Sequence, residues 1–313
     1  MTKLNQKTKF KLIAEDWLIF KKLSIKQSTY IKYDNLLKIH IFPYFKDMEF
    51  LDIDDVSISI FLSKMCDKLS ASTIKTIYYL IQAVLNYGSK KYKLDLRYYN
   101  VKLPKIKRNA VSLSETEQII IEKKANELNK EITRAIFLGL YAGLRLGEIC
   151  SLKWEDINFD RKTINVNKSV QRIRDISNNS KTVLLIGTTK SNNSNRIIPI
   201  SSPLLKYLKQ IYFNKGDCYV LNDKEKVIDP RKIQFQFKKL LDECNLSDIN
   251  FHMLRHTFAT NCIKLGIDVK SLSEILGHSN VNTTLNLYVH SSLEFKMQQM
   301  NKWENFISDN IVE

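Results

Sequence analysis

Apolar side chains recur at helical spacing through the first hundred residues of the chain. In the first of these stretches the apolar positions are Phe10, Ile13, Ala14, Trp17 and Leu18. A second stretch begins near Ser28 and is expected to end before Pro43. The acidic cluster 52–55 can cap a third helix, and a fourth follows Ser72 and is expected to end at Gly88. The pattern predicts a unit of four helices.

The pattern of apolar positions changes in the second half of the chain. Ser114 and Glu117 have the spacing of a capping box, and helical spacing continues over residues 131–141. Short runs rich in β-branched residues then predict three strands, at residues 163–166, 183–186 and 196–200.

Residues 191–195, Ser-Asn-Asn-Ser-Asn, are typical of a turn and predict a hairpin between the last two strands. Helical spacing returns after Ser202. The fold class is therefore predicted to be mainly α with a small antiparallel β-sheet in the C-terminal domain, an α+β protein.

A basic segment without periodicity separates the two regions. It runs from Lys102 to Asn109 and contains Pro104. Such a composition is typical of an interdomain linker. We expect a helical domain over residues 1–103, a basic linker over 104–111 and a second domain over 112–313.

The charge of the chain points to a polyanionic partner. Lysine and arginine total 49 against 33 acidic residues, a net charge of +16 over 313 residues. Such an excess attracts nucleic acid first and an anionic membrane surface second. No apolar run reaches the roughly 18–20 residues that span a bilayer, and no apolar segment follows the N-terminus as in a signal peptide. The five cysteines are scattered, which favours reduced thiols in a cytoplasmic protein over disulfides or a metal site.

The segment around His252 carries the strongest candidate chemistry. Asn250 can cap a helix that ends near Gly266, and on it His252 and Arg255 lie near one face. Grouping these cations is costly without an anion, and a phosphate diester suits an arginine fork beside a histidine donor. His256, on the same face, is interpreted more simply as an interior histidine.

Four further residues are ambiguous when each is taken alone. Arg145 follows a glycine break and could bind phosphate with Glu148 orienting it, or form a surface ion pair. Lys190 precedes the predicted turn and could donate a proton or be solvated. His278 projects from a turn after Gly277, and position alone would not single out Tyr288 among 14 tyrosines.

Taken together, these segments resemble the tyrosine recombinase, or phage integrase, family. The matching pieces, in order, are Gly143-Leu144-Arg145-x-x-Glu148, Thr189-Lys190, His252-x-x-Arg255-His256, Leu276-Gly277-His278 and Tyr288. The resemblance is strong over about residues 111–300 and looser over 10–100, where such enzymes carry a helical core-DNA-binding domain.

The resemblance implies a DNA breaking and rejoining enzyme that forms a 3′-phosphotyrosyl intermediate without metal or cofactor. Tyr288 would be the nucleophile and Lys190 the general acid. The two arginines, Arg145 and Arg255, would clamp the phosphate, with His252 and His278 as hydrogen-bonding partners. The implied partners are duplex DNA with inverted-repeat core sites, three further copies of the chain, and in some members a directionality factor.

Several details depart from the family pattern. Position 147 is glycine where many members have serine, and the gap from His278 to Tyr288 is one residue longer than in several relatives. The lengthened region 166–183 makes Lys181 a rival to Lys190. About ten residues precede the first helix, so we expect no arm-binding domain, as in shorter, Xer-like members.

The C-terminal tail has apolar side chains at helical spacing. They are Leu293, Met297, Met300, Trp303 and Ile307. We expect this helix to contact a neighbouring subunit, although packing on its own domain is the alternative. Two other functions stay open: a relaxing enzyme of the type IB topoisomerase kind, and a DNA-binding regulator that does not cleave.

Overall fold

The computed structural model describes residues 8–93, 101–104, 112–128, 130–175, 182–188, 195–212, 216–285 and 293–311. The chain divides into two compact units, residues 1–109 with 173–181 and residues 110–172 with 182–313. Of the predicted linker at 104–111, only Pro104 is among the described residues.

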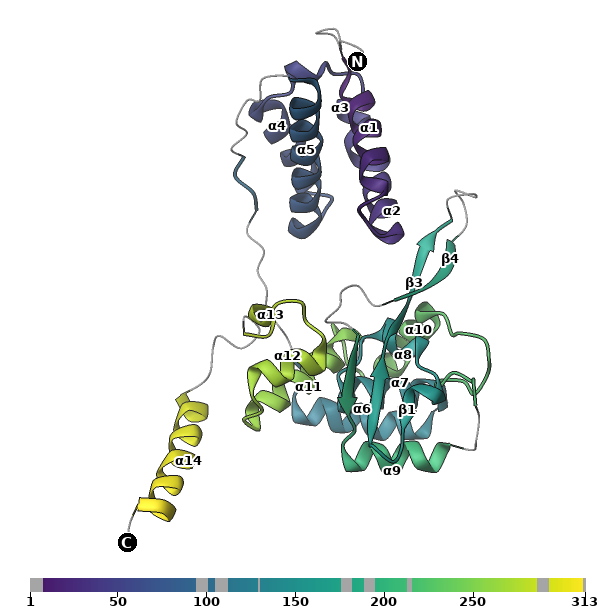
Figure 1. Ribbon diagram of the computed structural model, residues 1–313, viewed down its shortest axis with the longest axis vertical. Helices are drawn as coiled ribbons and strands as arrows, with labels where there is room; N and C mark the ends of the chain where they lie inside the picture. Colours follow the sequence, from purple (N-terminus) through teal and green to yellow (C-terminus); the bar gives the residue numbers. More distant parts are fainter. Residues whose placement is uncertain are drawn as a thin grey trace. The chain divides into compact units, whose positions relative to one another are not determined.

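Residues 8–93, the main part of the first unit, form helices joined by short turns (Figure 1). Its elements are α1 (Phe10–Lys22), α2 (Gln27–Leu36), a π-turn (Leu37–Ile41), α3 (Phe42–Phe45), a 3₁₀ turn (Phe50–Asp52), α4 (Asp55–Cys66) and α5 (Ala71–Tyr92). Asp54 caps α4 as predicted, since its side chain accepts the backbone N–H of Ser57 at 2.8 Å. The aromatic ring of Phe45 packs on those of Phe10 and Phe61 at the centre of the core.

Two expected helix ends in this unit are wrong. The chain stays helical through Pro43, because the π-turn places the proline in the first turn of α3, where its missing N–H costs no bond. Helix α5 continues past Gly88 to Tyr92. Gly88 is a packing residue, since a Cβ there would lie 2.7 Å from the Phe50 ring.

The second unit combines helices with two small sheets. Its elements are α6 (Glu115–Glu127), α7 (Lys130–Ala142), α8 (Leu146–Ser151), a 3₁₀ turn (Trp154–Asp156), β1 (Ile157–Asn158), β2 (Thr163–Val166), β3 (Lys168–Arg174), β4 (Thr182–Thr188), β5 (Arg196–Pro199), α9 (Ser202–Ile211), α10 (Pro230–Glu243), α11 (His252–Lys264), α12 (Val269–Leu276), α13 (Val281–Leu285) and α14 (Leu293–Ile311).

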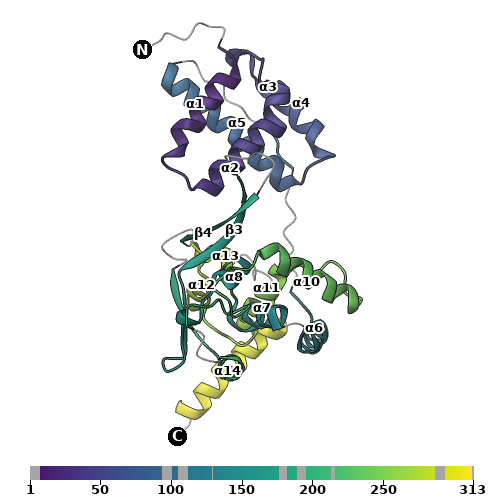
Figure 2. The ribbon, with the colours of Figure 1, turned by 90° about the vertical axis from the view of Figure 1, so that its right-hand side faces the viewer.

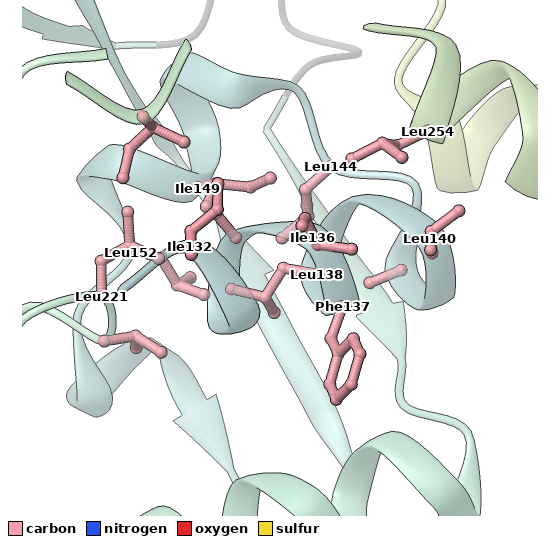
Figure 3. Packing of buried hydrophobic residues seen from close by; sticks show 14 of the residues in the cluster. Ile132, Ile136, Phe137, Leu138, Leu140, Leu144, Ile149, Leu152, Leu221 and Leu254 are labelled. Atoms are coloured by element: carbon pink, nitrogen blue, oxygen red, sulfur yellow. The ribbon is translucent and has the colours of Figure 1, made fainter. Parts of the chain in front are cut away.

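Helix α7 is the centre of this unit. It packs against α6, α8, α10 and α11, and Figure 3 shows its apolar side chains among those of the neighbouring elements. Ile136 and Leu138 are almost fully buried there, as are Ile149 of α8 and Leu254 of α11. Because both α8 and α11 rest on α7, their first turns are held in a fixed relation.

The strands pair differently from the prediction. Strand β5 pairs antiparallel with β2, which also pairs with β1, while β4 pairs with β3 in a separate two-stranded sheet. Figure 2 shows β3 and β4 side by side as a ribbon. The expected hairpin between β4 and β5 is therefore wrong, and residues 189–194 connect two sheets. The predicted class, mainly α with small antiparallel sheets, is confirmed.

Candidate active site

Arg255 is anchored between two turns by its guanidinium. It lies in the first half of α11 and is 3% exposed, because Leu254 beside it packs in the core. Its Nη1 donates to the carbonyl oxygen of Gly143 at 2.7 Å, and its Nη2 donates to that of Leu276 at 2.6 Å. Both turns contain a glycine with positive φ, Gly143 at 62° and Gly277 at 64°, so each can present a carbonyl inward.

Arg145 reaches the same turn from another element. It is the N-cap of α8, and its Nη2 donates to the carbonyl oxygen of Gly277 at 3.0 Å. Arg145 and Arg255 thus bind the carbonyls of consecutive residues, Gly277 and Leu276. The turn that ends α12 brings together two arginines that are 110 residues apart in the sequence (255 − 145).

Glu148 orients Arg145 and is itself held by a second arginine. Its Oε1 accepts Nη1 of Arg145 at 2.8 Å and Nη1 of Arg196 at 3.1 Å. Its Oε2 accepts the backbone N–H of Arg145 at 2.9 Å and Nη2 of Arg196 at 3.0 Å. Glu148 is 3% exposed, so the surface ion pair considered for Arg145 is ruled out.

The neighbouring arginines favour the ionised form of Glu148. Burial by itself would raise the pKa of this carboxyl, but the hydrogen bonds and charge of Arg196, and then the charge of Arg145, hold the pKa below its ordinary value. The carboxylate is therefore ionised at neutral pH. One anion between two cations leaves the three side chains with a net positive charge.

His278 follows directly after this turn. Its Nδ1 lies 2.8 Å from the Thr284 hydroxyl of α13, which fixes the ring. Burial, followed by the charges of Arg255, Arg145 and Arg196, lowers the pKa of His278 to about 4. The imidazole is neutral at pH 7, and any anion bound beside these arginines would raise its pKa again.

His252 opens α11 on the same face as His256. The two rings meet edge to face with their centroids 4.7 Å apart. The pKa of His252 is lowered to about 4, first because the surrounding protein partly removes water from the ring and then because of the charges of His256, Arg255 and Arg145. His252 is exposed and His256 half-buried, so His252 is the member of the pair that a ligand can reach.

Four of the six predicted site residues meet in this region. Direct bonds connect Arg145 and Arg255 to the turn that leads into His278, and the charges of both arginines reach the His252 ring. Lys190 and Tyr288, with the rival Lys181, lie outside the described residues.

Arg196 was not predicted as a site residue. Its guanidinium is buried, and its Nε donates to the carbonyl oxygen of Ile275 at 2.5 Å. The sequence did hold a signal, because a strand alternates its faces and Arg196 shares the inward face with Ile198 and Ile200. An arginine on the same buried face of a strand as isoleucines needs an anionic partner inside the protein.

The described residues hold no cluster of three or more histidine, cysteine, aspartate or glutamate side chains able to bind a metal ion. Over the same residues, no helix has the length and apolar character needed to cross a membrane.

Comparison with known proteins agrees with this geometry. The phage integrase family model matches residues 110–294, and the N-terminal SAM-like domain of phage integrases matches residues 9–66. The chain is 30% identical over 305 residues to a XerC-like tyrosine recombinase of Caldanaerobacter subterraneus, covering 86% of this chain and 75% of that protein. It is 25% identical over 214 residues to the Tn916 transposase of Enterococcus faecalis, covering 63% and 51% of the two chains.

Solved structures share the fold. The Tn1549 transposon integrase in complex with transposon right end DNA matches with a TM-score of 0.82 and 18% identity, over 95% of this chain and all of that one. A lambda integrase in a tetramer bound to a Holliday junction matches with a TM-score of 0.66 and 17% identity, over 92% of this chain and 80% of that one.

Fold and site thus define a DNA breaking and rejoining enzyme with a mainly helical architecture. The chain belongs to the phage integrase family, the tyrosine recombinases.

Proposed function

We propose that the protein is a site-specific recombinase that cleaves and rejoins duplex DNA through a 3′-phosphotyrosyl intermediate at Tyr288. The observation that carries the proposal is the turn 276–277, whose consecutive carbonyls hold Arg255 and Arg145 beside His278. Two fixed guanidinium groups and a histidine suit one phosphate diester, because its developing charge lies on the two non-bridging oxygens.

In the first step the Tyr288 hydroxyl oxygen attacks phosphorus while a neutral histidine, His252 or His278, takes up the hydroxyl proton. A bond forms between this oxygen and phosphorus, the bond to the 5′ oxygen breaks, and Lys190 donates a proton to the leaving 5′ oxygen. Rejoining is the reverse, with a 5′ hydroxyl as the nucleophile. The tyrosyl diester keeps the energy of the original bond, so two easier steps replace one difficult exchange.

The arginines would stabilise the transition state. Arg145 and Arg255 are already fixed by backbone carbonyls, so they need little reorganisation when negative charge builds up on the phosphate. His252 and His278 are neutral before binding and can each donate a hydrogen bond to the same group or take up a proton.

For the whole chain we propose the division predicted from the sequence. Residues 1–103 would bind the core DNA, 104–111 would link, and 112–313 would carry the chemistry. Four copies would assemble on inverted-repeat sites in the cytoplasm, some reactions needing a directionality factor. Helix α14 supports assembly, because its Met297, Met300 and Trp303 side chains are each more than half exposed.

Nicked duplex DNA tests the chemistry directly. A pool of nicked duplexes with a randomised core is incubated with the protein, denatured, and searched for covalent adducts. We expect adducts with the unaltered chain and none with Tyr288→Phe, which should still bind the same duplexes. Tyr79→Phe is the matched control, since Tyr79 is an exposed tyrosine of α5.

The outcomes separate the competing functions. DNA binding without an adduct would overturn the proposal and favour a non-cleaving regulator. An adduct with relaxation of supercoiled DNA, but no exchange between two duplexes, would favour a relaxing enzyme. Adducts in Tyr288→Phe would place the nucleophile elsewhere.

A further inference from the structure

Arg196 occupies a position that the proposed chemistry does not use. It is the first residue of β5, and the connection that carries Lys190 ends just before it. Its side chain is 6% exposed and turns away from solvent, between α8 and the end of α12.

Three separate contacts fix this side chain. Its two terminal nitrogens bind the two oxygens of Glu148 at 3.1 and 3.0 Å, and its Nε binds the carbonyl of Ile275 at 2.5 Å. The guanidinium also packs against Gly277, where an added Cβ would lie 2.9 Å from Nη1 and 3.1 Å from Cζ. Arg196 therefore touches both groups that position Arg145, namely the Glu148 carboxylate and the Gly277 turn.

The contact between Arg196 and Glu148 also affects the net charge around Arg145. A carboxylate bonded to Arg145 alone would cancel its charge and weaken its attraction for phosphate. With Arg196 on the opposite side, Glu148 can orient Arg145 while the three groups stay net positive. The bidentate geometry requires a guanidinium, because a lysine ammonium cannot present two parallel N–H bonds.

We propose that Arg196 is a positioning residue for DNA cleavage, which aims Arg145 at the scissile phosphate and preserves its charge by holding Glu148 and the turn 275–277 together. This inference rests on the proposed function. Arg196 acts through Arg145 on the non-bridging oxygens of the phosphate, and it does not act on the leaving oxygen.

Single-turnover cleavage tests this assignment with the nicked duplex recovered most often from the randomised pool. Saturating protein makes the rate independent of affinity. We expect Arg196→Gln to slow adduct formation by about 10- to 100-fold, the range known for losing a residue that orients a metal ligand, which is a comparable positioning role. Arg196→Lys should recover only part of the rate, because it keeps the charge and loses the fork.

Arg134→Gln is the matched control. Arg134 is an equally buried arginine of the same unit, but it binds the carbonyl of Val220 and the carboxylate of Asp223, away from the site. We expect this control to lose thermal stability while the folded fraction cleaves at the unaltered rate. Equal slowing in Arg134→Gln and Arg196→Gln would mean a merely structural role and would overturn the proposal.

A bridging 5′ sulfur in place of the leaving oxygen separates the two possible routes. A thiolate leaves without a proton, so this duplex bypasses the general acid. We expect the Arg196→Gln defect to be the same with sulfur as with oxygen. A defect that vanishes on the sulfur duplex would show that Arg196 acts through the lysine, which overturns the proposal.

The double variant Arg196→Gln/Glu148→Gln keeps the test valid if Arg196→Gln alone folds poorly. It removes both buried charges together, and it should cleave as slowly as Glu148→Gln alone, because both residues act on Arg145 by one route. Multiplied defects would overturn the proposal. Cleavage by the unaltered protein but no slowing in any Arg196 variant overturns this inference alone, whereas no adduct with the unaltered protein overturns the proposed function as well.

Discussion

Replacing Glu148 by alanine should strongly destabilise the second unit. The substitution removes a carboxylate that accepts four hydrogen bonds, two from Arg145 and two from Arg196. The Arg196 side chain, 6% exposed, is left as a buried cation without that carboxylate. Removing one partner of a buried ion pair costs about 3–5 kcal/mol.

The size of the effect can be measured by calorimetry on the full chain. A loss of about 3–5 kcal/mol in a unit of this size corresponds to a melting temperature lower by roughly 6–20 °C. Hydrogen exchange should localise the change to peptides of α8, β5 and α12, the elements that the ion pairs join.

Asp156→Ala is the control for losing a buried acid. Burial raises the pKa of Asp156, so its charged form is poorly stabilised and its removal should cost less. The pKa of Glu148 is lowered, so its contribution is complete above the ordinary value of 4.5 and is lost as the pH falls through the folded-state pKa. The melting difference between the unaltered chain and Glu148→Ala should therefore be constant near neutrality and shrink below about pH 4.5. A Glu148→Ala melting temperature equal to that of Asp156→Ala would refute the reasoning.

Three further predictions follow from the geometry and the charge. Gly147→Ser should lose about 1–3 kcal/mol of unfolding free energy in a thermal melt, because a Cβ there would lie 2.5 Å from the Val170 carbonyl; Gly187→Ser, where an added Cβ meets nothing within 4 Å, should melt like the unaltered chain. DNA binding should take up protons and tighten as the pH falls toward about 4, because a bound phosphate raises the lowered pKa values of His252 and His278. Equal calorimetric enthalpies in buffers of different ionisation enthalpy would contradict this. The logarithm of DNA affinity should fall linearly with the logarithm of salt concentration, with a slope near −0.9 per phosphate contacted; an affinity insensitive to salt would be incompatible with the net charge of +16 acting on DNA.

Local patterns predicted most helices because burial and capping are local signals. The capping box Ser114–Glu117 starts α6, and Gly277 ends α12 in the left-handed conformation, both as expected. The helix ends predicted at Pro43 and Gly88 were wrong for different reasons. Pro43 is compatible with the first turn of a helix, and Gly88 is required by close packing against an aromatic ring.

Strand pairing could not be predicted in the same way. The β-branched runs identified β2, β4 and β5, but a turn-like segment between β4 and β5 does not reveal that each pairs with another strand. Their partners are set by contacts distant in the sequence, including that of β5 with α12. Gly147, a departure from the family pattern, is explained by the same arrangement, since the β3 backbone leaves no room for a side chain.

The sequence indicated several residues of the candidate site but not the hydrogen bonds that hold them together. The resemblance to the phage integrase family implied Arg145, Arg255 and His278 as site residues, and the structure shows that one turn holds both arginines. Arg196 was not predicted as a site residue because its alternation with buried isoleucines indicates burial but not its partner, and that partner, Glu148, lies 48 residues earlier.

Mapping the covalent link residue by residue tests the central claim most directly. The adduct formed on the nicked duplex is digested with nuclease and protease, and the modified peptide is sequenced by mass spectrometry. The account predicts that a nucleotide is attached through its 3′ phosphate to Tyr288, one of 14 tyrosines in the chain. A nucleotide on any other tyrosine, or one joined through a 5′ phosphate, would contradict it.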